Sequence, residues 1–157
     1  MRFKLLAAAA AALFAASAAQ AQMVEAKKPQ TIVAALQEAG YTAKLATDPT
    51  GDPMISSASS GVPFTVFFYN CNDNKNCATI QFSAGFKLTT ATTLGHINSW
   101  NGGQRFGRAH IDDEGDPVLR MDLDLDDGGM SSALFTDNLE YWVAVLNNFK
   151  KHIGFSE

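Results

Sequence analysis

The sequence is poor in the residues and motifs that usually reveal an enzyme. It has three histidines, two cysteines and no G-x-S-x-G, H-E-x-x-H or glycine-rich phosphate-binding motif. The histidines, His96, His110 and His152, fall on different expected elements, and no spacing between them places two on one metal-binding face. These absences favour a non-enzymatic protein with no catalytic residue and no cofactor.

Positive charge is also scarce. Twelve lysines and arginines oppose sixteen aspartates and glutamates, which gives a formal net charge of −4. No basic cluster is longer than Lys27-Lys28 or Lys150-Lys151, so we expect no nucleic-acid partner. Beyond residue 21 no apolar run is long enough to cross a membrane, and no stable membrane insertion is expected.

The longest apolar run, residues 5–19, lies at the N-terminus behind Arg2 and Lys4. At about 1.5 Å per helical residue it spans about 22 Å, less than the ~30 Å hydrocarbon core of a bilayer. The run ends in Ala19-Gln20-Ala21, a small-x-small cleavage pattern. Residues 1–21 are therefore predicted to be a signal peptide, cleaved between Ala21 and Gln22, that directs the protein to the periplasm or out of the cell. An uncleaved membrane anchor is the alternative.

Cleavage also changes the charge of the protein. It would remove Arg2 and Lys4 but no acid, so the net charge would move from −4 to −6. Such an acidic chain is expected to be soluble once the apolar run is gone.

The two cysteines, Cys71 and Cys77, flank a turn-forming spacer, Asn72-Asp73-Asn74-Lys75-Asn76. Strand-like segments lie on both sides, so the pair is expected at the end of a hairpin, where cross-strand Cβ atoms come close. An oxidising compartment favours a disulfide between them. A redox or zinc pair is the weaker alternative, because the spacing is not C-x-x-C and no histidine is nearby.

Hydrophobic periodicity predicts one α+β domain over residues 30–157, after a mobile polar lead-in at residues 22–29. The order of elements is α-β-(β)-β-β-α-β-β-α, which predicts an antiparallel sheet with flanking helices. Helices are expected at residues 30–39, between Thr90 and Gly102, and from Ser131 or Ser132 to Ile153. Strands are expected at residues 41–47, 54–55, 64–69, 78–87, 105–111 and 118–125.

Two of these helices have clear apolar faces. The middle helix is expected to turn Leu94, Ile97 and Trp100 inward. The last helix carries a stripe at four- and three-residue steps, which predicts a helix packed on a sheet. Its members are Phe135, Leu139, Trp142, Leu146, Phe149 and Ile153.

Asp122, Asp124 and Asp126 resemble the opening of a calcium-binding loop, with carboxylates at positions one, three and five. The sixth position is Asp127 instead of glycine, and the twelfth is Ala133 instead of glutamate. The two interpretations are a half-buried strand with aspartates on its solvent side and a weak divalent-metal site.

A further set of polar residues is expected on the same solvent-facing side of the sheet. Arg108 and His110 come from one strand, and Arg120 and Asp122 come from its hairpin partner. Opposite charges across strands stabilise a sheet modestly. The alternative is a recognition surface for a polar partner.

The order of several short segments resembles the YbjN-type domain family, described as bacterial sensory-transduction regulators. The segments are residues 36–41, 67–71, 97–101, 105–109 and 121–129, ahead of the Trp142 helix. The family's fold is similar to that of type III secretion chaperones, which implies binding of protein segments and homodimer formation. The resemblance supplies no catalytic residue.

Together these features predict an exported, non-enzymatic, protein-binding or chaperone-like domain. Its expected partner is a periplasmic protein or peptide, or a second copy of the chain. A module that binds a small ligand or a divalent metal is the alternative, and a hydrolase comes third.

Overall fold

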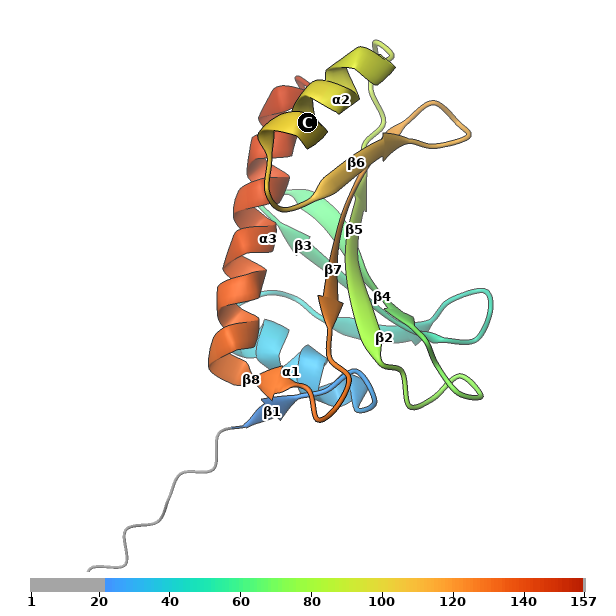
Figure 1. The fold of residues 1–157 in the computed structure, drawn as a ribbon, viewed down its shortest axis with the longest axis vertical. Coiled ribbons are helices and arrows are strands. Elements are labelled where there is room, and N and C mark those ends of the chain that lie inside the picture. Colours follow the sequence, from blue (N-terminus) through green and yellow to red (C-terminus); the bar gives the residue numbers. More distant parts are fainter. Residues whose placement is uncertain (1–21, 157) are drawn as a thin grey trace, which may run out of the picture.

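The structure is a computed structural model, and residues 22–156 are described here; the predicted signal peptide lies outside them. Within this range a six-stranded sheet, in the order β2-β3-β4-β5-β7-β6, forms one layer, and helices lie against one of its faces (Figure 1). The elements are β1 (Met23–Val24), α1 (Pro29–Glu38), β2 (Lys44–Thr47), β3 (Pro53–Ser59), β4 (Val62–Tyr69), β5 (Thr79–Gly85), α2 (Leu94–Gly103), β6 (Arg108–Ile111), β7 (Pro117–Asp124), β8 (Met130–Ser131) and α3 (Ser132–His152).

The predicted α+β class and antiparallel sheet are confirmed, since every strand pair in the sheet is antiparallel. Strand β3 is longer than the expected 54–55. Its serines conceal an alternation in which Ile55, Ser57 and Ser59 are buried and the residues between them are exposed. Small polar side chains can occupy inward positions of a strand, so hydrophobicity alone underestimated its length.

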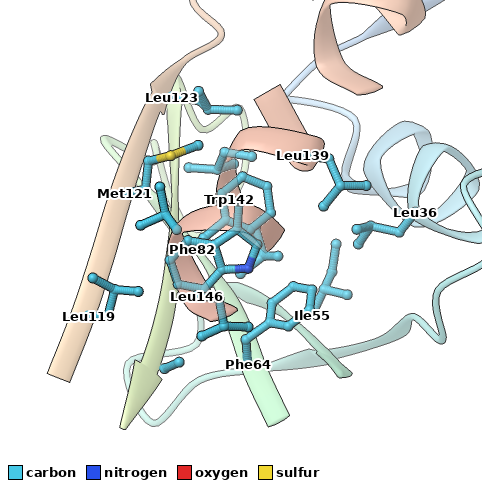
Figure 2. Close-up of a cluster of buried hydrophobic side chains, with 14 of the residues drawn as sticks. Leu36, Ile55, Phe64, Phe82, Leu119, Met121, Leu123, Leu139, Trp142 and Leu146 are labelled. Atoms are coloured by element: carbon cyan, nitrogen blue, oxygen red, sulfur yellow. The ribbon is translucent and has the colours of Figure 1, made fainter. Parts of the chain in front are cut away.

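Helix α3 packs its predicted stripe on the sheet. Trp142 is 0% exposed, and its ring centroid lies 5.5 Å from that of Phe82 and 5.8 Å from that of Phe64, on β5 and β4 (Figure 2). The Ser131 hydroxyl caps the helix by accepting from the Leu134 N–H at 3.3 Å. Burying each such large apolar side chain contributes roughly 1.5–3 kcal/mol, so this contact holds α3 to the sheet.

The expectation of a mobile lead-in is wrong. Strand β1 pairs with β8, and Val24 and Ala26 are buried. A Cβ atom at Gly129 (φ 79°) would collide with the Val24 carbonyl oxygen, so only glycine allows β1 to approach. The strand is too short to show a period, and its partner lies far along the chain.

Leu94 also departs from its prediction, because it is 70% exposed whereas Ile97 and Trp100 are buried. Leu94 occupies the first turn of α2, which Thr93 caps by accepting from the backbone of His96. Trp100, nearly two turns later, reaches Phe149 of α3 at 4.9 Å between ring centroids. Only the later turns of α2 therefore meet the core.

The hairpins β2–β3 and β6–β7 use the same turn. The Asp48 N–H donates to the carbonyl of Asp52, and the N–H of Gly51 donates to the carbonyl of Asp48. Asp112, Gly115 and Asp116 repeat this pattern at residues 112–116, and both glycines have positive φ. The Thr50 hydroxyl, which donates to Asp48, lowers the pKa of that carboxyl. The two hairpins thus leave their turns in the same hydrogen-bond register.

Candidate functional site

The face of the sheet turned away from α1 and α3 is here called the outer face (Figure 1). A chain of hydrogen-bonded polar side chains crosses this face. The Tyr69 hydroxyl of β4 donates to Gln81 of β5 at 3.5 Å, and the Gln81 amide donates to Asp122 of β7 at 2.5 Å. Arg108 of β6 donates to the other oxygen of Asp122 at 3.3 and 3.4 Å. These bonds connect the neighbouring strands β4, β5, β7 and β6, and the carboxylate of Asp122 accepts from both β5 and β6.

All four residues of the predicted recognition surface lie on this outer face. Arg108 and Arg120 are direct cross-strand partners, and His110 stands opposite Val118 one row further along. Arg108 is paired with Asp122, but the Nε of Arg120 is buried and has no hydrogen-bond partner. Burial lowers the pKa of His110, and the charges of Arg120 and Arg108 lower it further. The β6–β7 part of the face is therefore locally positive.

The three candidate metal ligands have separate roles. Asp122 belongs to the chain just described, Asp124 accepts from the N–H of Asp126 at 3.0 Å, and Asp126 accepts from the N–H of Asp127 at 2.9 Å. Among residues 22–156 no three histidine, cysteine, aspartate or glutamate side chains gather around a common point. Asp124 and Asp126 shape the turn after β7.

Cys71 and Cys77 form a disulfide at the loop between β4 and β5, as predicted. The loop residues Asp73, Asn74 and Asn76 have positive φ values between 49° and 58°, the left-handed conformation that asparagine and aspartate tolerate. Both half-cystines are thus engaged in a structural link and are not available as nucleophiles.

The fold brings together two histidines whose spacing in the sequence gave no sign of a contact. The rings of His96, on α2, and His152, at the end of α3, lie 4.1 Å apart between centroids. His152 Nε2 donates to the His96 carbonyl at 3.0 Å. No periodic signal could reveal this contact, because the two residues belong to different helices that meet only in the folded chain.

The β6 edge of the sheet is closed by a side chain. The amide of Asn101, on α2, donates to the Ala109 carbonyl at 2.9 Å and accepts from the Ala109 N–H at 2.8 Å. Asn101 therefore satisfies the backbone groups of a neighbouring strand and not those of its own helix end. A further strand cannot pair with Ala109 while Asn101 occupies it.

The opposite edge, β2, has no such cover. No hydrogen bond from the backbone of Leu45 or Thr47 to a group outside the β2–β3 pair is present in residues 22–156. A groove of about 400 Å³ lies beside this strand. It is lined by Pro29, Leu45, Ala46, Thr47, Gly51, Pro53 and Asn74.

The comparison with protein families agrees with this architecture. A family profile described as "Putative bacterial sensory transduction regulator", YbjN, matches residues 28–155. The chain belongs to the YbjN family. The match confirms the resemblance drawn from the sequence. No curated protein and no solved structure gives a significant match.

The YbjN description names a regulator and specifies no reaction, which agrees with the lack of a catalytic motif. In the described part of this YbjN chain, no helix combines the length and apolar character needed to span a bilayer. The most distinctive surfaces of the fold are thus an uncovered sheet edge at β2 and a positive cluster on the outer face.

Proposed function

We propose that this YbjN chain is an exported, non-enzymatic domain that binds an extended segment of a partner protein, taking it as an added strand along β2. The single observation that carries the proposal is the difference between the two edges of the sheet. One edge is blocked by Asn101, and the other is free and lies beside a groove.

Because the two hairpins share the same turn, the edge strands β2 and β6 can be compared residue by residue. Ala109 lies three residues before Asp112, and Leu45 lies three residues before Asp48. In an antiparallel pair, alternate residues direct both backbone groups away from the partner strand. Ala109 is such a residue, as its bonds to Asn101 show. Leu45 and Thr47 occupy the equivalent outward positions on β2.

The groove indicates what kind of segment fits. Its lining combines apolar surface from Pro29, Leu45 and Pro53 with the amide of Asn74, and the Asn74 amide already donates to Asp52 at 2.8 Å. Strand addition takes its affinity from backbone hydrogen bonds and its selectivity from pockets for alternate side chains. An extended peptide with an apolar residue directed into the groove meets both requirements.

The test is selection of binding peptides from a random library on residues 22–157, with counter-selection on Thr47→Pro. Proline removes the outward N–H of Thr47 and leaves the ladder intact, because Thr47 pairs with Pro53 in the non-bonded register. Thr47→Val, which keeps the N–H, is the matched control. We expect selected peptides to bind the parent and Thr47→Val and to lose at least tenfold in affinity for Thr47→Pro.

Peptides that bind all three proteins equally would contradict the proposal, as would selection that yields no binder. Circular dichroism and thermal unfolding of Thr47→Pro verify that the variant remains folded, so that loss of binding reports on the edge alone.

A further inference from the structure

We propose that Arg108 and Arg120 on the outer face form a binding site for an oxyanion, a carboxylate or a phosphate group. This inference does not depend on strand addition at β2, because the site lies on β6 and β7 at the other side of the sheet. It rests on the cross-strand register, on the partners of each charged group and on the space around them.

The register brings the donors into one row. Arg120 has Arg108 as its partner on β6 and Ser83 as its partner on β5. Side chains in such rows have Cβ atoms about 4.5–5.5 Å apart on the same face of the sheet. Two guanidinium groups and a hydroxyl are thus within reach of one small anion.

The next row of cross-strand partners, formed by Gly85, Val118 and His110, leaves room beside these donors. Its β5 position is Gly85, where an added Cβ atom would meet nothing within 4 Å. His110 stands on β6 in the same row, with Val118 between them. The site is therefore flanked by an unobstructed backbone on one strand and by an imidazole on another.

The positive charge of this row is only partly neutralised, because Arg108 has an ion-pair partner and Arg120 has none in the described residues. Arg108 and Arg120 stand directly opposite each other, and like charges in this arrangement destabilise a sheet. Asp122 is the one carboxylate with a described ion pair to these arginines. Asp122 already accepts from Gln81 and Arg108. In the described residues Arg120 makes no ion pair, and its Nε is a buried donor with no acceptor.

Guanidinium groups suit this ligand class. Their planar fork matches the two oxygens of a carboxylate or two oxygens of a phosphate. The Arg108–Asp122 contacts at 3.3 and 3.4 Å are long for charged hydrogen bonds. Arg108 can therefore turn from Asp122 toward a bound anion without losing a strong bond.

The experiment is an NMR titration of residues 22–157 with sodium phosphate and, separately, with sodium acetate, at ionic strength held constant with sodium chloride. We expect saturable shifts at the amides of β6 and β7 and an upward shift of the His110 pKa, because a bound anion favours the imidazolium. Saturation with phosphate alone or with acetate alone supports the site and identifies the group it prefers.

Three variants locate the effect. Arg120→Gln is expected to weaken binding at least tenfold, and Arg120→Lys, which keeps the charge but loses the fork, is expected to weaken it less. Arg105→Gln, whose guanidinium lies over the Phe106 ring, is the matched control and should bind as the parent does. Shifts that do not saturate, that chloride reproduces, or that persist in Arg120→Gln would overturn the proposal.

Discussion

His110 shows how a single residue reports on the charge of the outer face. It is half-buried on β6, and this burial is the main reason why the pKa of its imidazole lies below the ordinary 6.5. The charges of Arg120 and Arg108 lower the pKa further, and the charge of Asp112 opposes them. The folded protein thus prefers a neutral His110. In the unfolded chain the same imidazole takes up its proton at higher pH.

This difference gives stability a pH dependence of known sign. As the pH falls below about 6.5, the unfolded chain binds more protons than the folded one, so the free energy of unfolding decreases until the lower folded pKa is passed. In His110→Gln we expect a smaller decrease between about pH 7 and pH 5. Urea unfolding at a series of pH values measures it, and an unchanged slope would contradict the account.

The loop between β4 and β5 illustrates stabilisation at the scale of an element. The Cys71–Cys77 disulfide closes it, and Cys77 is buried. Removing the link in a Cys71→Ala, Cys77→Ala double variant is expected to lower the free energy of unfolding by about 2 kcal/mol, since the unfolded chain regains loop entropy. Reductant should destabilise the parent similarly and leave the double variant unchanged. A parent indifferent to reductant would contradict this.

The β6 edge depends on one side chain from α2. In Asn101→Ala both bonds to Ala109 are lost, which is expected to lower the free energy of unfolding by about 1–2 kcal/mol. The freed edge should also promote self-association. Asn98→Ala is the matched control, because Asn98 is exposed on the same helix and its side chain has no described hydrogen bond. Size-exclusion chromatography and urea unfolding compare the two, and equal behaviour would contradict the role of Asn101.

Elements with a strong period could be predicted from the sequence, and contacts between distant segments could not. The α3 stripe predicted that Phe135, Leu139, Trp142, Leu146 and Phe149 are buried. The pairing of β1 with β8 depends on two residues and on the backbone approach at Gly129, and neither leaves a periodic trace.

The same limit applies to the candidate surfaces. Residue alternation on β6 and β7 sufficed to place Arg108, His110, Arg120 and Asp122 on one face. It could not reveal that Asn101 closes one edge of the sheet, because that bond joins a helix to a strand through tertiary packing. The order of strands, and with it the identity of the open edge, also required the fold.

At the scale of the whole molecule, the predicted cleavage site lies directly before Gln22, the first residue that the structure describes. The Gln22 carbonyl accepts from the N–H of Ser132 at 2.9 Å and from its hydroxyl at 2.8 Å. Cleavage before Gln22 would therefore leave β1 and its contacts intact. It would also leave a domain with a net charge of −6 by sequence, after loss of Arg2 and Lys4.

Export has a direct test. When the full chain is expressed in a Gram-negative host, we expect the periplasmic fraction to contain a protein whose intact mass corresponds to residues 22–157 with a disulfide. An Ala19→Arg, Ala21→Arg variant should retain residues 1–21, because signal peptidase requires small residues at these positions. A parent protein that keeps residues 1–21, or that stays in the cytoplasm, would contradict export.

Strand addition at β2 is tested most directly by the hydrogen-exchange rates of the backbone amides on the two edge strands. Hydrogen exchange followed by NMR compares Leu45 and Thr47 on the open edge with Ala109 on the closed edge, in the free protein and with a library-selected peptide. We predict fast exchange at Leu45 and Thr47 in the free protein, slow exchange at Ala109, and slowing at Leu45 and Thr47 when the peptide binds. Slow exchange at Leu45 and Thr47 without peptide, or peptide-induced slowing confined to other elements, would contradict strand addition at this edge.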